Sequence, residues 1–510
     1  MMLRMKYLWM SVIIGPMVAL LATSCSENSN FSSPDIDAPK MLTFGFYVED
    51  NADVLSKDYA VDLTAVQTSG SSTVSIHVPM PATVDKSSLV ARFTMSDGTT
   101  AKVNGVEQVS RQTANDFTVP VDYILTKDNV NVRCAVDIVK ATNLKWREMP
   151  VFDALTVYGD PVMKVNPKDN LPYVAFKIRT DNDYRSSVIK YENGAWVHVG
   201  DAGFGSKISS SYFDFSIAPD GTPYIAYSNS EIKATTTTLA GAMTVMKYDG
   251  SVWNYVGNEN GILKAQSNYI ALAALENELV AAQQNNSAKA DYPRRSMVLS
   301  TYKEGQWTSA NHASVTNEIF TLSMANNNTS AYVLSINRGS VSGVNYGYNV
   351  LKYENGEWTP MLVNTIEPDA TANSPYICGC AVSADNVPYI WFGDNAGGSY
   401  NIRVKTYNAE TNQWKTLTGN VLPLGFAFDS HTEVAIAIGT DGMPYLVYNN
   451  KTDQNYPYFM YLDAETGQWT TPVRVAEVAA SGLNIAFSHT GVCYVTFADG
   501  DNHIRTYSYE

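Results

Sequence analysis

The sequence is poor in the residues and motifs that mark most enzymes and disulfide-stabilised domains. Its 510 residues include only 5 cysteines and 6 histidines. The nucleophile motif G-x-S-x-G, the zinc motif H-E-x-x-H, glycine-rich phosphate loops and calcium-binding loops are absent. We therefore expect no cofactor and no metal, and the cysteines define no disulfide framework.

Charged residues are also scarce, and basic residues are outnumbered. They make up 17% of the chain, and 50 acidic against 35 basic residues give a formal net charge of −15. An acidic surface repels the phosphates of nucleic acids and anionic lipid headgroups. We expect no nucleic-acid partner. An aromatic content of 11% is typical of a β-rich globular protein rather than a disordered one.

The first residues contain the basic and apolar segments of a secretion signal. Arg4 and Lys6 precede a mostly apolar stretch over residues 7–22. Gly15 and Pro16 interrupt this stretch, which disfavours a stable membrane span. We expect a signal peptide over residues 1–24.

The sequence L-A-T-S-C, which ends at Cys25, resembles the bacterial lipoprotein box, although Leu21 stands four rather than three residues before the cysteine. The resemblance implies that Cys25 is lipidated, and Ser26 implies an outer-membrane destination in the cell envelope. An ordinary cleaved signal is the alternative. The polar residues 25–39 are expected to form a flexible tether.

Tryptophan recurs about every 55 residues through most of the chain, a period that suits one four-stranded blade of a β-propeller. Its positions are Trp146, Trp196, Trp253, Trp307, Trp358, Trp414 and Trp469. Before each of the later six lies a tight turn followed by an apolar strand, as in A-P-D-G-T-P-Y-I-A-Y. Seven units imply seven blades.

The two ends of this array complete each other. The C-terminal sequence H-I-R-T-Y-S-Y-E reads as a third strand without a fourth, whereas the Trp146 segment has no unit before it. Pairing these two strands completes the seventh blade and removes an exposed sheet edge.

Residues 40–140 have a different pattern of short alternating strands, typical of a β-sandwich. The order of V-S-I-H-V-P-M, F-T-V-P-V-D-Y and a final strand resembles the immunoglobulin-like modules of Bacteroidota surface lipoproteins. That resemblance implies a spacer without chemistry.

The segment W-V-H-V-G-D-A-G-F-G…P-D-G-T-P-Y-I-A-Y, which begins at Trp196, resembles a repeat of bacterial secreted propellers. The resemblance implies architecture but no particular activity. The expected fold is therefore all-β: an immunoglobulin-like β-sandwich over 40–140, then a seven-bladed β-propeller over 141–510, closed by pairing of the Trp146 strand with the C-terminal strand.

Ligand binding is expected on the face that carries the long, variable connections, which we call the long-loop face. Tyrosines and arginines gather there, and both residue types serve glycan and protein recognition. The candidates are Tyr184, Arg185, Tyr292, Arg294, Arg338, Tyr346, Tyr348, Tyr400 and Tyr456.

Catalysis by two loop carboxylates is the alternative, and the sequence selects no pair from them. They are Asp181, Asp183, Asp291, Asp394, Asp429 and Asp453. The turn K-Y-E-N-G-A-W lacks the serine of the sialidase turn. The histidines His198, His431 and His503 are expected to be ordinary strand or surface residues.

Four cysteines, Cys134, Cys378, Cys380 and Cys493, follow the leader and are interpreted as small buried apolar residues, with their pairing left open. The expected protein is a surface-exposed lipoprotein that binds an extracellular ligand without catalysis, with a glycan preferred. A carbohydrate-active hydrolase or lyase is one alternative. A structural component or adhesin that binds a surface protein is the other.

Overall fold

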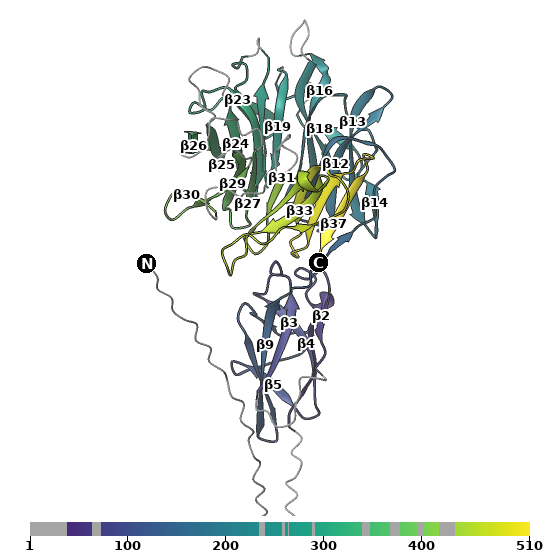
Figure 1. Ribbon diagram of the computed structural model, residues 1–510, viewed down its shortest axis with the longest axis vertical. Helices are drawn as coiled ribbons and strands as arrows, with labels where there is room; N and C mark the ends of the chain where they lie inside the picture. Colours follow the sequence, from purple (N-terminus) through teal and green to yellow (C-terminus); the bar gives the residue numbers. More distant parts are fainter. Residues whose placement is uncertain are drawn as a thin grey trace, which may run out of the picture.

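Strands make up nearly all of the regular structure (Figure 1). The computed structural model describes residues 38–63, 73–233, 240–257, 261–263, 265–287, 291–338, 347–367, 378–394, 401–417 and 434–510. In these segments the only helical elements are the short 3-10 turns η1 (Val48–Asp50) and η3 (Lys451–Asp453). None of the described segments forms a helix with the length and apolar character needed to cross a membrane.

Two sheets of the N-terminal part enclose one core. The strands of the first, in spatial order, are β2 (Tyr59–Val61), β1 (Met41–Phe46), β4 (Leu89–Met95) and β7 (Ala114–Asn115). Those of the second are β3 (Thr73–Met80), β9 (Val130–Lys140), β8 (Val121–Lys127), β5 (Thr100–Val103) and β6 (Val106–Glu107). Only β3 and β9 pair in parallel. Alternate residues such as Ile76 and Val78 point inward, where they join Phe44, Phe46 and Tyr123. We call this two-sheet sandwich the N-terminal module.

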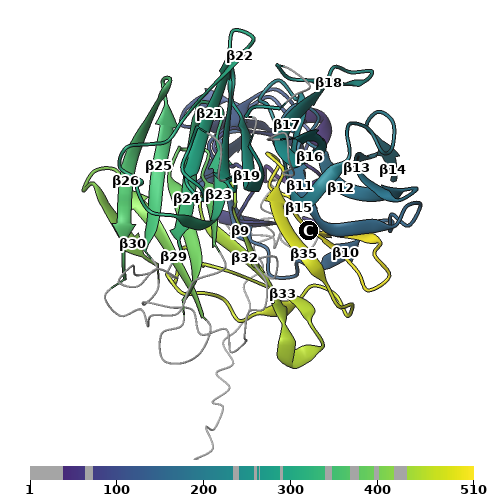
Figure 2. The same cartoon turned by 90° about the horizontal axis from the view of Figure 1, so that it is seen from above.

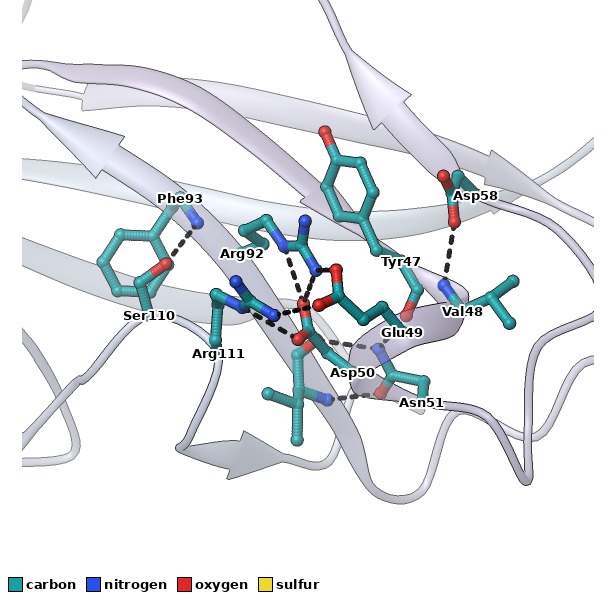
Figure 3. Close-up of polar contacts among 11 residues, drawn as sticks. Tyr47, Val48, Glu49, Asp50, Asn51, Asp58, Arg92, Phe93, Ser110 and Arg111 are labelled. Carbon is teal, nitrogen blue, oxygen red and sulfur yellow. Dashed lines mark hydrogen bonds and ion pairs between the residues drawn. The ribbon is translucent and has the colours of Figure 1, made fainter.

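A charge network binds the η1 turn to the first sheet of this module (Figure 3). Arg92 donates to Asp50 over 2.7 Å and to Glu49 over 2.8 Å. Arg111 donates to the same two carboxylates over 3.0 Å and 2.6 Å. Each arginine therefore bridges both acids, a geometry that suits the planar guanidinium group.

Seven four-stranded sheets follow, and we number them in chain order. Sheet 1 consists of β11 (Val157–Val165), β12 (Pro172–Thr180), β13 (Asp183–Glu192) and β14 (Ala195–His198). Sheet 2 consists of β15 (Ile208–Ile217), β16 (Pro223–Lys233), β17 (Ala240–Tyr248) and β18 (Trp253–Tyr255). Sheet 3 consists of β19 (Ser267–Ala274), β20 (Leu279–Asn285), β21 (Met297–Lys303) and β22 (Gln306–Ala310). All neighbouring strands in them run antiparallel.

The remaining four sheets repeat this order. Sheet 4 consists of β23 (Ile319–Asn326), β24 (Ser330–Asn337), β25 (Tyr348–Glu354) and β26 (Glu357–Thr365), and sheet 5 of β27 (Cys378–Val382), β28 (Pro388–Asp394), β29 (Asn401–Asn408) and β30 (Gln413–Thr416). Sheet 6 consists of β31 (Val434–Ile438), β32 (Pro444–Asn450), β33 (Tyr456–Tyr461) and β34 (Val473–Arg474). Sheet 7 consists of β35 (Ser481–Phe487), β36 (Cys493–Ala498), β37 (Ile504–Tyr509) and β10 (Trp146–Glu148). Sheet 7 alone combines strands from distant parts of the sequence.

The sheets surround a common axis (Figure 2). The first strand of each sheet contacts the first strand of the next, and β35 contacts β11, so the contacts return to their starting point. The arrangement is β-propeller-like. The short turns between first and second strands lie on one face, which we call the short-turn face, and the long-loop face is opposite.

The pairing predicted between the Trp146 strand and the C-terminal strand is present. Trp146 lies opposite Tyr509 in the ladder of β10 and β37. Backbone bonds extend it at both ends, from the Lys145 N–H to the Glu510 carbonyl over 3.1 Å and from the Phe152 N–H to the Ile504 carbonyl over 3.0 Å. The ring of Trp146 packs edge-on against Phe459 in sheet 6.

The repeated tryptophans join neighbouring sheets. The indole N–H of Trp253 donates to the carbonyl of Val199 in the preceding unit over 2.7 Å. A Cβ on Gly200 would lie 2.9 Å from this indole, which explains the V-G pair after Trp196. Trp469 differs from the prediction, because it forms only an isolated bridge and β34 begins after Pro472, which has no N–H for the ladder.

The N-terminal module contacts the short-turn face at sheets 6 and 7. The Thr83 hydroxyl donates to the carbonyl of Gly491 over 2.6 Å, and the Thr440 hydroxyl donates to the carbonyl of Thr83. Lys140 forms an ion pair with Asp463. These contacts place the module on the side opposite the long-loop face.

The first described residues lie at the end of the module that is remote from the propeller-like part. Met41 pairs with Met95, at the end of β4 remote from the propeller-like part, whereas Thr83 lies before the other end of β4. The module therefore separates the N-terminal entry point from the long-loop face (Figure 1).

Candidate functional site

The predicted residues Tyr184 and Arg185 lie in a strand rather than in a long loop. β12 and β13 pair up to Thr180 and Asp183, so only residues 181–182 form the connection. Tyr184 is 40% exposed, and its ring centroid lies 5.4 Å from that of Tyr158. Arg185 donates to the carbonyl of Gly205.

Three further candidates belong to sheets 3 and 4. The Tyr292 hydroxyl donates to the carbonyl of Ser309 over 2.8 Å, which holds the tyrosine against its own sheet. Arg294 is exposed in the turn before β21. Arg338 follows β24, and its guanidinium lies 3.6 Å from the carboxylate of Glu318.

Tyr348 corrects the expectation of an exposed loop residue. It begins β25, is 2% exposed, and donates its hydroxyl to Glu367 over 2.6 Å. It lies inside the sheet because it pairs with Ile336 of β24 in the ladder. Tyr456 begins β33, and the guanidinium of Arg474 lies 5.3 Å from its ring centroid. Tyr346, Tyr400 and Cys25 lie outside the described residues.

These candidates come from different sheets, and most of the described ones contact residues near their own strands, as Tyr292, Arg338 and Tyr456 do. The structure instead brings together three rings that the sequence analysis did not single out. Tyr212, Tyr269 and Phe320 occupy the first strands of sheets 2, 3 and 4. The centroids of Tyr212 and Tyr269 are 4.5 Å apart, and those of Tyr269 and Phe320 are 5.6 Å apart. We call them the axial aromatic arc.

A local irregularity in each strand positions the arc. The register shifts between Ile208 and Phe213, between Asn268 and Ala271, and between Ile319 and Thr321. Such bulges redirect side chains and often occur beside functional sites. Tyr269 has a φ of +45°, which is uncommon for a residue with a side chain. All three shifts lie near the strand starts, and thus near the long-loop face.

The arc is half-buried and close to ionisable groups. Burial, followed by a hydrogen bond with Tyr212, raises the pKa of Tyr269. On the same strand as Tyr212, Asp214 accepts the N–H groups of Leu272 and Phe215, each over 2.8 Å. Desolvation raises the pKa of Asp214, and Lys164 partly offsets it. The bond to Leu272 ties the strand that carries Tyr212 to the strand that carries Tyr269.

The prediction that the four cysteines are small buried residues is confirmed for two of them. Cys134 and Cys493 are buried, whereas Cys378 and Cys380 are half-buried on one side of β27. All four are free thiols. Burial raises the pKa of Cys378 to about 12, so this thiol stays protonated near neutral pH.

The described candidate carboxylates of the catalytic alternative are distributed over four sheets, and two of them form ion pairs. Asp183 forms a 2.7 Å ion pair with Lys207 in sheets 1 and 2, and Asp453 forms one with Arg474 in sheet 6. Asp181 and Asp291 lie in turns of sheets 1 and 3, Asp394 ends β28, and Asp429 lies outside the described residues. His198 is an exposed residue of β14, and His431 is likewise outside.

One described cluster has the composition of a metal site. Single ligand atoms of Asp499, Asp501 and His503 lie within 4.8 Å of one another. However, Asp499 already accepts the backbone N–H groups of Asp501 and His503 and the guanidinium of Arg505. Its oxygens are therefore used by the turn itself.

Comparing the same positions in successive units of the sequence could have identified part of the arc. Tyr212 and Tyr269 each precede by five residues the last residue paired across the turn to the second strand, whereas Phe320 precedes it by six. Aligning the units on the turns between their first and second strands would have placed the two tyrosines at one level around the axis, but not Phe320.

The fold and the arc define a class of protein: an all-β chain with a β-propeller-like ring and an aromatic surface at one end. No family model and no curated protein matches the chain. Among solved structures, an ulvan lyase of a polysaccharide lyase family has 13% identity, covers 70% of this chain and 95% of its own, and gives a TM-score of 0.45.

Two other solved structures resemble the chain to a similar degree. The β-propeller domain of a protease from Pyrococcus furiosus has 10% identity over 70% of this chain and 96% of its own, with a TM-score of 0.40. An α-L-arabinanase from Penicillium chrysogenum has 11% identity over 59% and 92%, with a TM-score of 0.37. Identities and scores this low define neither a family nor an activity for this chain.

Proposed function

We propose that the chain is a surface-exposed lipoprotein that binds an extracellular glycan on its long-loop face without catalysis. In this proposal Cys25 carries the lipid, residues 26–39 form the tether, and residues 40–140 form an immunoglobulin-like spacer. Residues 141–510 form a seven-bladed β-propeller closed by β10. The order of these parts lets the spacer hold the binding face away from the outer membrane.

The observation that carries the proposal is the axial aromatic arc. Aromatic rings stack on the apolar faces of sugar rings, while neighbouring hydroxyl and carboxyl groups bond the sugar hydroxyls. Tyr212, Tyr269 and Phe320 provide such a surface, since their rings pack on one another. Tyr184 and Tyr158 supply a second aromatic pair towards the same face.

The test is glycan binding by the intact chain and by a Tyr212→Ala, Phe320→Ala variant. We expect binding without release of products, and at least tenfold weaker binding in the variant, which corresponds to about 1.4 kcal/mol. Tyr191→Ala is the matched control, because Tyr191 packs on Trp196 near the short-turn face.

Other results would replace the proposal. Release of shorter or unsaturated oligosaccharides would identify a hydrolase or lyase. Capture of a surface protein without any glycan signal would identify an adhesin or structural component. Equal losses in the variant and in the Tyr191→Ala control would remove the arc from the site.

A further inference from the structure

Sheets 4 and 5 are separated by a groove that the ligand-binding proposal does not use. Its volume is about 1170 Å³. Its rim includes turn residues Asn355, Asp385 and Asn412, so it opens at the short-turn face and not beside the arc. The module contacts described above are with sheets 6 and 7.

The outer strand of sheet 4 explains the width of the groove. β26 has 9 residues, whereas the outer strands of the other six sheets have 2 to 5. Its register shifts twice along β25, and Pro360 within it has no N–H for the ladder. The bent strand forms one wall, through residues 359–362. Bulges of this kind are common beside functional sites.

The floor of the groove carries a charge at a position where most of the other sheets have an apolar residue. Lys405 lies two residues before Tyr407, a position that Met246 and Leu351 occupy before the equivalent tyrosines of sheets 2 and 4. Its ammonium forms an ion pair with Glu367 and lies 3.3 Å from the Tyr348 hydroxyl.

Glu367 is the centre of this buried network. Its carboxylate accepts the Tyr348 hydroxyl over 2.6 Å and lies 3.3 Å from the guanidinium of Arg403. The Glu367 side chain is 8% exposed and that of Arg403 is 1% exposed. A buried ion network contributes little to stability compared with apolar packing, so the fold alone does not require it. Buried ionisable groups at a cleft are candidates for a functional site.

The walls combine aromatic rings with neutralised charges. Trp414 and Tyr407 have ring centroids 5.5 Å apart, and Tyr332 lies opposite on sheet 4. Lys352 forms a 2.8 Å ion pair with Glu354. Since both lysines that line the groove are paired with carboxylates, no described lysine there offers an unneutralised charge to an anionic ligand.

We propose that this groove is a second binding site, for a short segment of an uncharged oligosaccharide. The rings of Trp414 and Tyr407 stack on sugar faces, while Lys405 and the amide of Asn412 bond the hydroxyls. Tyr348 and Glu367 hold the Lys405 ammonium in place from below. Aromatic stacking with a few fixed polar groups is the usual composition of a small-ligand site. This inference is independent of the aromatic arc, because no residue is shared.

The test is titration of the intact chain with panels of neutral, uronic-acid and sulfated oligosaccharides, followed by nuclear magnetic resonance saturation transfer. We expect neutral oligosaccharides to bind with little dependence on salt. Tyr407→Ala and Lys405→Met should each weaken this binding at least tenfold. Lys405→Met places in sheet 5 the residue that sheet 2 has naturally, but it also leaves Glu367 with only Tyr348 and Arg403 as partners. Its melting profile is therefore measured beside its binding, and the weaker binding should persist at temperatures well below its melting transition.

Tyr248→Ala is the matched control, since Tyr248 packs on Trp253 as Tyr407 packs on Trp414. It should bind as the unmodified chain does. The Tyr212→Ala, Phe320→Ala variant should also keep this binding, which separates the groove from the arc. Failure of the intact chain to bind any neutral oligosaccharide, a preference for acidic ones that salt abolishes, or displacement by peptides alone would overturn the proposal.

Discussion

At the scale of single residues, Asp50 links pH to the stability of the N-terminal module. Desolvation opposes its ionisation, but hydrogen bonds from Arg92 and Arg111 outweigh this and lower its pKa. A carboxyl whose folded pKa is lowered stabilises the fold above its unfolded pKa of about 3.9, and this contribution is lost as pH falls through the folded value.

We therefore expect Asp50→Asn to lower the melting temperature of the module at pH 7, by about 5 °C or more. The difference from the unmodified chain should shrink as pH falls below about 4, because the original carboxyl is then protonated too. Circular-dichroism melts across pH 3 to 7 measure both effects. Asp53→Asn, at an exposed position nearby, is the control and should change neither. A pH-independent difference would contradict the role of the Asp50 charge.

At the scale of elements, the closing strand β10 depends on residues far along the chain. Its Trp146 packs on Phe459 and Tyr509. We expect Trp146→Ala to lower the free energy of unfolding by roughly 2–4 kcal/mol and to expose residues 141–152 to limited proteolysis. Trp307→Ala, in an equivalent strand of sheet 3, should leave that segment protected. Equal cleavage in both variants would contradict a special role for β10.

The repeating elements could be predicted from the sequence because they depend on local patterns. Tight turns, alternating strands and the tryptophan period led to the pairing of Trp146 with the C-terminal strand, which the structure contains. The outer strand of sheet 6 was misplaced, since Pro472 interrupts it after Trp469. The parallel pair β3 and β9 was not predicted, because strand order depends on packing between distant segments.

The candidate site was much less predictable. Tyr212 and Phe320 resemble any aromatic strand residues in sequence, and only the register shifts bring them together. Tyr348 was assigned to a loop because the sequence does not show where β25 begins. Lys405 and Glu367 are 38 residues apart, so their ion pair follows from the packing of sheet 5 on sheet 4.

At the scale of the whole molecule, Lys140 joins the module to the propeller-like part. It pairs with Asp463 and lies 5.2 Å from the ring centroid of Tyr461. The hydrogen bond from Lys140, the largest influence, lowers the pKa of Asp463 to about 2, so the pair stays charged at neutral pH. A second close contact lies nearby. A Cβ added to Gly491 would come within 2.4 Å of the Thr83 carbonyl oxygen.

We expect Lys140→Ala to loosen the module without changing ligand binding. Spin labels on the module and on sheet 2 should show a broader distance distribution in the variant than in the unmodified chain. Lys127→Ala, at the other end of the module, serves as the control. A distribution that is equally narrow in all three proteins would show that the hydrogen bonds of Thr83 with Gly491 and Thr440 fix the orientation without Lys140.

The position of β10 directly after the module has a mechanical consequence. If the N-terminus is held and the opposite face is pulled by what it has bound, tension reaches the ring first through the segment that ends β9 and begins β10. That tension acts along the strand, so the bonds between residues 145–152 and 504–510 resist it together rather than parting one after another. The paired strands β10 and β37 thus carry this tension together with the contacts of Thr83 and Lys140.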